Sequence, residues 1–128
     1  MNRHDMRSPL ARAIGLGSAK DGADAWWAER VSAIALVPLT LWFVASIIAH
    51  TGSDHAAFVV WLRTPIASIP MVLLLIALFY HTALGLQVVI EDYVHSEFEF
   101  AAVIAMRLTC FAMATAGIMA TLRIVFGG

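Results

Sequence analysis

The chain has 128 residues, of which 61% are hydrophobic and only 13% are charged, and its formal net charge is −1. Soluble domains are usually about half apolar and a quarter charged, so this composition argues against an ordinary water-soluble fold. A net charge so close to zero offers no basic surface to nucleic acid, and we expect no nucleic-acid partner.

The first 30 residues are polar and mixed in charge, and they lack the apolar core of a signal peptide. Their five basic residues are Arg3, Arg7, Arg12, Lys20 and Arg30. Basic residues close to a first membrane span stay on the cytoplasmic side of the membrane. We therefore expect residues 1–30 to form a cytoplasmic N-terminal tail.

Three apolar runs follow this tail, and only the third contains charged side chains, those of Arg107 and Arg123. A helix needs about 20 mostly apolar residues to cross the hydrocarbon core, where lipid offers the backbone no hydrogen bonds. The runs do not alternate between apolar and polar residues as barrel strands do. The sequence therefore predicts an all-α integral membrane protein, with a transmembrane anchor over residues 31–128. Its three transmembrane helices are expected at about 31–50, 68–91 and 101–126.

His81 lies near the middle of the second predicted span, far from any charged residue in the sequence. An ionisable side chain inside a membrane is costly, so it indicates a functional role by default. Two interpretations are open at this point. His81 is either a neutral histidine hydrogen-bonded to a neighbouring helix, or a ligand of a metal or haem.

Helical geometry places two further residues on the face of His81. Gly85 is four positions later, and Asp92, eleven positions later, lies about 16 Å further along the axis. A glycine beside an imidazole allows a flat macrocycle to approach the backbone, although a close helix–helix contact would explain Gly85 equally well. This stripe runs from the middle of the membrane to its expected cytoplasmic surface.

The other histidines are poorly placed to face His81: His50 ends the first span on the opposite side, and His95 lies in a loop. A six-coordinate haem on His81 would therefore need its second axial ligand from another chain. Arg30, at the start of the first span, is either a snorkelling side chain that fixes topology or a partner for a haem propionate.

The segment from His81 through Gly85 to Asp92 and Tyr93 resembles the hydrophobic membrane anchor of succinate dehydrogenase, respiratory complex II. That family carries a histidine, a glycine four residues later and an Asp-Tyr pair eleven and twelve residues later on its second helix. The start of the first span, Arg30-Val-Ser32-Ala, is similar to the family's Arg-x-Ser/Thr-Ala. Three spans and a polar N-terminal tail match as well, so the resemblance covers nearly the whole chain. The tail resembles the alphaproteobacterial and mitochondrial-type branch.

The resemblance implies a role for each matching residue. His81 would be one axial ligand of haem b, with Gly85 giving close approach and Arg30 contacting a propionate. Tyr93 would donate its hydroxyl to a carbonyl oxygen of the substrate ubiquinone, and Asp92 would border that quinone site. The implied partners are the cytochrome b, iron–sulfur and flavoprotein subunits, besides membrane lipid, in a bacterial inner membrane.

The chain carries no catalytic triad, CxxC pair or dinucleotide motif, and we expect no catalytic residue in it. The single Cys110 cannot hold an iron–sulfur cluster, so succinate oxidation would belong to the assembled enzyme. Two alternatives are an anchor without haem and the anchor of a related quinol:fumarate reductase. A transporter is disfavoured because intramembrane polarity is concentrated at one histidine.

Overall fold

The computed structural model describes residues 18–127, and every regular element in this range is a helix. These helices are α2 (Ser18–Ala49), α3 (His55–Leu62), α4 (Pro65–Tyr93) and α5 (Phe98–Phe126). Three of them, α2, α4 and α5, are long and apolar enough to cross a membrane. The prediction of an all-α protein with three transmembrane helices is confirmed. Most of the predicted tail, residues 1–17, lies outside the described residues.

The structure differs from the sequence expectation before the first span and in the segment that follows it. Helix α2 begins at Ser18, inside the segment expected to be a polar tail, because polar side chains can continue a helix beyond the hydrocarbon core. The short helix α3 lies between the first two predicted spans, where the sequence predicted no helix. It is capped by Asp54, whose carboxylate accepts a hydrogen bond from the Ala57 N–H at 2.8 Å. Pro65 then opens α4, because its fixed φ suits a first helical turn.

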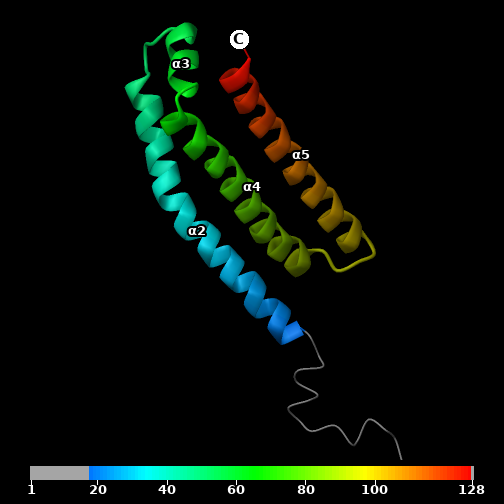
Figure 1. Ribbon diagram of the computed structural model, residues 1–128. Coiled ribbons are helices and arrows are strands. Elements are labelled where there is room, and N and C mark those ends of the chain that lie inside the picture. Colours follow the sequence, from blue (N-terminus) through cyan, green and yellow to red (C-terminus); the bar gives the residue numbers. More distant parts are fainter. Residues whose placement is uncertain (1–17, 128) are drawn as a thin grey trace, which may run out of the picture.

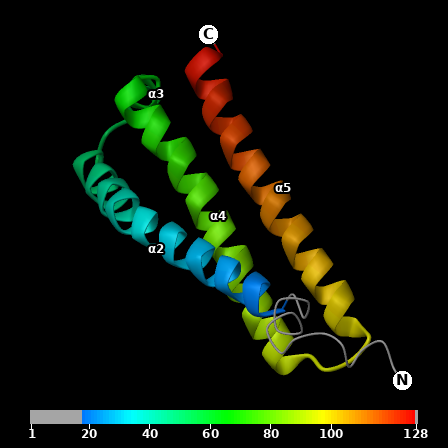
Figure 2. The same ribbon diagram turned by 60° about the horizontal axis from the view of Figure 1, so that its bottom comes forward.

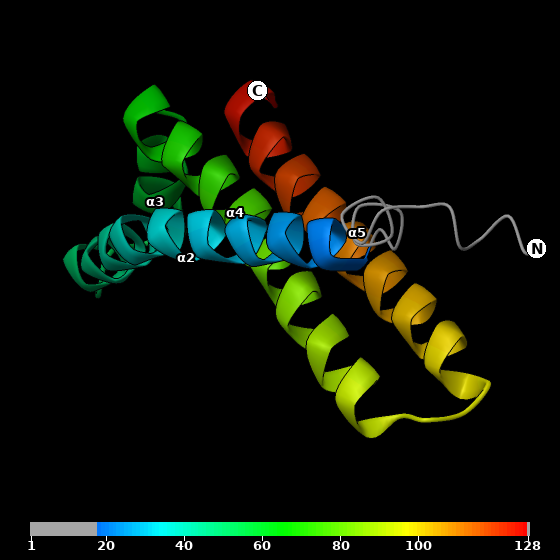
Figure 3. The same ribbon diagram turned by 90° about the horizontal axis from the view of Figure 1, so that it is seen from below.

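Helix α4 is the middle member of the three long helices. It contacts α2 and α5, whereas α2 and α5 do not contact each other within the described residues. Figure 1 shows a lower end, where α2 begins, α4 ends and α5 begins, and an upper end with α3 and the C-terminus. In Figures 2 and 3, α2 crosses α4 while α4 and α5 run side by side.

The interior of this layer is small. The buried side chains of the described residues are Ser32, Leu62, Ala67, Leu74 and Thr121. Gly117 on α5 lies close to Leu75 on α4, because a Cβ added at Gly117 would lie 3.1 Å from the Leu75 methyl groups. A small residue at this point lets the two helices pack through van der Waals contact. Most other apolar side chains face outward, as a bilayer requires.

At the upper end, aromatic rings fix α3 to the end of α2. The Trp61 ring lies 4.4 Å from the imidazole of His50 and 5.2 Å from the ring of Phe58, measured between centroids. The rings of Trp42 and Trp61 stack at 6.0 Å. His50 is held in turn by a 2.8 Å hydrogen bond between its Nδ1 and the Ser46 carbonyl. This cluster accounts for His50 as a packing residue, far along α2 from the level of His81.

Arg63, which directly follows α3, ties this end to α5. Its Nε donates to the Ile124 carbonyl at 3.0 Å, and its terminal nitrogen donates to the Gly127 carbonyl at 2.6 Å. The last carbonyls of a helix have no partner within the helix, and a cation there also opposes the negative end of the helix dipole. Arg63 therefore acts as a cap supplied from outside α5.

We predict that Arg63→Ala frays the last turn of α5, because both capping bonds are lost at a cost of about 1 kcal/mol. Amide hydrogen exchange of residues 124–127 in the detergent-purified protein should accelerate roughly fivefold. Arg63→Lys keeps the charge but not the forked pair of donors, so its exchange should fall between wild type and alanine. Unchanged exchange in Arg63→Ala would contradict the capping role.

Candidate functional site

The centre of the site is His81, on the face of α4 that meets α2. Its imidazole is half-buried, and its Nδ1 lies 2.9 Å from the hydroxyl oxygen of Ser32 on α2. Ser32 is itself only 6% exposed, and its Oγ also lies 2.9 Å from the backbone carbonyl of Glu29. The structure therefore anchors the intramembrane imidazole to a neighbouring helix through one ring nitrogen, and this contact does not use the other, Nε2.

Gly85, one turn below His81 on α4, faces unfilled space. A Cβ added there would meet no atom within 4 Å outside its own stretch of helix. Gly117 is the contrast, since its added Cβ would press against Leu75. Packing among the described residues therefore explains why position 117 holds a residue without a side chain, but it gives no such reason at position 85.

Asp92 and Tyr93 are the last two residues of α4, at the lower end of the layer. Both are exposed, and Tyr93 is 83% exposed. Because α4 runs unbroken from Pro65 to Tyr93, the eleven-residue spacing keeps Asp92 nearly in line with His81. The Asp92 carboxylate therefore lies at the end of the stripe that begins at the imidazole, whereas Tyr93, the next residue, lies about 100° further around the helix.

Arg30 lies on α2, two residues before Ser32, and is exposed. Its guanidinium carbon lies 5.2 Å from the centre of the Trp26 ring, a cation–π geometry one helical turn away. Because Ser32 contacts His81, Arg30 lies at about the level of His81 along α2. Among the side-chain hydrogen bonds and ring contacts of residues 18–127, none joins Arg30 to His81, Asp92 or Tyr93.

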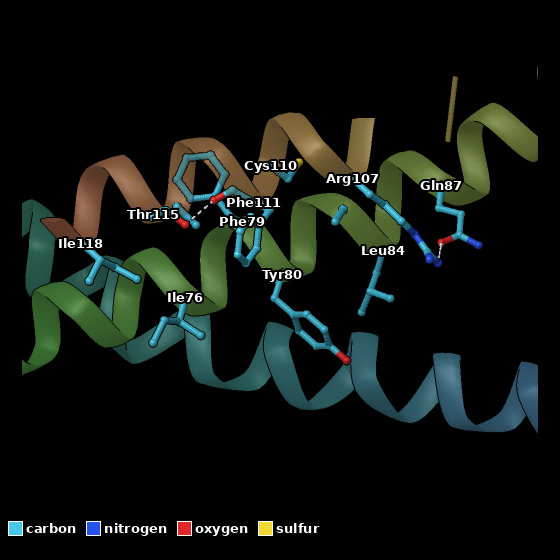
Figure 4. Close-up of a pocket in the computed structure, with 12 residues that line it drawn as sticks. Ile76, Phe79, Tyr80, Leu84, Gln87, Arg107, Cys110, Phe111, Thr115 and Ile118 are labelled. Atoms are coloured by element: carbon cyan, nitrogen blue, oxygen red, sulfur yellow. Dashed lines mark hydrogen bonds between the residues drawn. The ribbon is translucent and has the colours of Figure 1, made fainter. Parts of the chain in front are cut away.

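A separate groove of about 560 Å³ lies between α4 and α5 (Figure 4). Its walls are mostly apolar, with Tyr80 on α4 and Cys110 on α5 among them. At one end the Arg107 guanidinium donates to the Gln87 carbonyl oxygen, and the Gln87 amide donates to the Glu91 carboxylate at 2.7 Å. Arg107, on α5, is thus paired with a residue of α4. Neither His81 nor Tyr93 lines this groove.

Within residues 18–127, no group of three or more His, Cys, Asp or Glu side chains could hold a metal ion. This finding concerns metal sites built from three or more side chains of one chain. A haem needs only one imidazole from a chain as an axial ligand, so the finding does not address haem binding. Sequence reasoning missed the contact of Ser32 with His81. The only signal for it was a small hydroxyl residue near the start of a span, which gives no register between helices.

Comparison with known proteins gives the family. The family model described as "Succinate dehydrogenase/Fumarate reductase transmembrane subunit" matches residues 4–114. No solved structure matches the chain.

Curated relatives agree with the family model. The succinate dehydrogenase hydrophobic membrane anchor subunit of Rickettsia bellii is 40% identical over 91 residues, 71% of this chain and 73% of that protein. The protein of the same name from Paracoccus denitrificans is 29% identical over 120 residues, 94% of this chain and 93% of that protein. These findings confirm the resemblance to a succinate dehydrogenase membrane anchor that the sequence motifs predicted. The chain therefore belongs to the family of succinate dehydrogenase and fumarate reductase transmembrane subunits.

Proposed function

We propose that this chain is the membrane anchor of a succinate:ubiquinone oxidoreductase, in which it binds haem b together with a cytochrome b subunit and contributes to ubiquinone reduction. The observation that carries the proposal is the anchored imidazole of His81 inside a span, directly above the unfilled space at Gly85. The enzyme activity belongs to the assembly, with flavoprotein and iron–sulfur subunits supplying the electrons from succinate.

The residues around His81 fit an axial haem ligand. The hydrogen bond at Nδ1 holds the ring while Nε2 is available to an iron. A histidine that binds a metal through one ring nitrogen usually makes a hydrogen bond through the other. Gly85, about 6 Å along the same helix, leaves the room that a flat macrocycle needs beside the backbone. When bound, haem b supplies a one-electron redox centre beside the path to the quinone. Its second axial ligand would come from the cytochrome b subunit, and Arg30 would turn from Trp26 towards a propionate.

The end of α4 suits quinone chemistry. Reducing a quinone to a quinol consumes two protons, so the site needs polar groups that water can reach. Asp92 and Tyr93 are exposed at the lower end of α4, where the hydrocarbon core would give way to water. The Tyr93 hydroxyl would donate to a quinone oxygen and would bind it more strongly as negative charge develops there. Asp92 would deliver protons or orient neighbouring polar groups.

The proposed orientation follows from the basic residues of the N-terminal segment. Basic residues beside a first span favour the cytoplasmic side, so the lower end would face the cytoplasm of a bacterium, with the chain spanning the inner membrane three times. Asp92 and Tyr93 would then lie on the side from which the soluble subunits reach the membrane. The anchor of a quinol:fumarate reductase is the second candidate, because the family description includes both enzymes.

We predict that His81→Leu removes the b-type band from the reduced-minus-oxidised spectrum of the detergent-purified complex, because the iron loses an axial ligand. His50→Leu is the matched control: it removes a histidine from the upper end and should leave the band unchanged. Subunit composition is checked in both variants. An unchanged band in an assembled His81→Leu complex would mean that haem is held elsewhere, and a wild-type complex without the band would leave a structural anchor.

We predict that replacing Gly85 lowers haem content in steps, with Gly85→Ala retaining more haem than Gly85→Leu. A Cβ at position 85 would meet no atom of this chain within 4 Å. A loss of haem in Gly85→Ala would therefore come from a clash with the haem and not with the protein. The haem-to-protein ratio of the purified complex measures the effect. Ala83→Leu, on the groove side of the same helix, serves as the control. Full haem content in Gly85→Leu would contradict a macrocycle at this position.

We predict that Tyr93→Phe lowers kcat/KM for ubiquinone by at least about tenfold, because the donor to the developing negative charge is lost. Succinate oxidation with a soluble dye as acceptor should stay at the wild-type rate. Tyr80→Phe is a matched control, since Tyr80 is the chain's other tyrosine and lines the separate groove. Equal losses with dye and quinone would point to an assembly defect and against a quinone contact.

A further inference from the structure

The direction of the hydrogen bond between Ser32 and His81 can be worked out, because a serine hydroxyl has only one proton to donate. The Ser32 Oγ has two polar neighbours, each at 2.9 Å: the Glu29 carbonyl and Nδ1 of His81. A carbonyl oxygen can only accept a hydrogen bond. The hydroxyl proton must therefore point to Glu29 if the contact with that carbonyl is to be favourable.

The direction of the second bond follows from the first. With its proton on the Glu29 carbonyl, the Ser32 oxygen can only accept, so Nδ1 of His81 must be the donor. The opposite arrangement would place the serine oxygen and the carbonyl oxygen 2.9 Å apart with no proton between them. A neutral imidazole carries one N–H, and placing it on Nδ1 leaves a lone pair on Nε2.

We propose that Ser32 is a positioning residue that holds His81 in the Nδ1–H tautomer and thereby makes Nε2 the atom that binds the haem iron. This inference rests on the proposed haem function and adds a residue to it. Ser32 would not touch the haem. It would act through the imidazole, whose tautomer and ring direction a hydrogen bond at the other nitrogen commonly fixes.

Burial makes this arrangement durable. Ser32 is 6% exposed, so water has little access to replace the serine oxygen as the acceptor for Nδ1–H. The hydroxyl is also tied to its own helix through Glu29, three residues earlier, which fixes the direction of its lone pairs. The crossing of α2 over α4 therefore presents a rigid acceptor rather than a rotating hydroxyl.

An acceptor on Nδ1–H has a chemical consequence for a ligating imidazole. It draws the N–H proton outward and makes Nε2 a stronger electron donor, which favours ferric over ferrous iron. Loss of the acceptor should therefore raise the midpoint potential of the haem and free the ring to rotate. Loss of partners at this distance from a metal typically costs about tenfold or more in affinity for it.

Three variants in the detergent-purified complex test the proposal. Ser32→Ala removes the acceptor, and Ser32→Thr keeps a hydroxyl at the same position. Ser46→Ala is the matched control on α2, because the Ser46 hydroxyl also bonds to a backbone carbonyl, that of Trp42 at 2.7 Å, but does not contact an imidazole. The readouts are the midpoint potential of haem b, the low-spin ferric EPR spectrum and the rate of haem loss to apomyoglobin.

We expect Ser32→Ala to raise the potential, shift the EPR g-values and speed haem loss about tenfold. Ser32→Thr and Ser46→Ala should resemble the wild type. If Ser32→Ala does not assemble, Ser32→Cys keeps nearly the same volume with a much weaker acceptor and should shift the same readouts.

Two results would overturn the proposal while leaving haem ligation by His81 intact. One is a wild-type potential and EPR spectrum in Ser32→Ala. The other is an equal shift in Ser32→Ala and Ser32→Thr, which would indicate packing rather than the hydroxyl. By contrast, a normal haem band in an assembled His81→Leu complex would refute haem ligation by His81, and the role of Ser32 would fall with it.

Discussion

The position of α4 between α2 and α5 is the constraint on which the rest of the structure depends. Each outer helix packs against α4 and not against the other, so α4 carries both packed interfaces and the candidate site. One face of α4 receives Ser32 from α2, and another receives the close approach of α5 at Gly117. The stripe from His81 through Gly85 keeps open space beside it. A closed three-helix bundle would have filled that space with its own side chains.

Polar side chains meet across both interfaces of α4. His81 meets Ser32 across the α2–α4 contact, and Arg107 meets Gln87 across the α4–α5 contact. Such bonds contribute modestly to helix association, since unfolded segments in a membrane also find partners. Their larger effect is directional, because each bond fixes where a side chain points. A fixed direction is what the proposed role of His81 as a ligand requires.

The sequence predicted the three spans well because the bilayer imposes a length and an apolar composition that can be counted along the chain. It misjudged the segments beyond the bilayer, where that rule does not apply. Helix α2 continues into polar residues from Ser18, and α3 forms between the first two predicted spans, where no helix was predicted. The N-cap at Asp54 and the aromatic contacts of Trp61 stabilise α3, and both depend on local geometry more than on hydropathy.

The sequence by itself determined the helices and the order of residues on each one. Helical periodicity alone aligns His81, Gly85 and Asp92, because turns of 3.6 residues repeat wherever the helix is unbroken. Only the tertiary structure decided which residue of α2 contacts the imidazole of His81. It also decided whether side chains of this chain fill the space beside Gly85. Both outcomes depend on the crossing of α2 over α4. No periodicity within either helix encodes that crossing, since packing between helices sets their relative register.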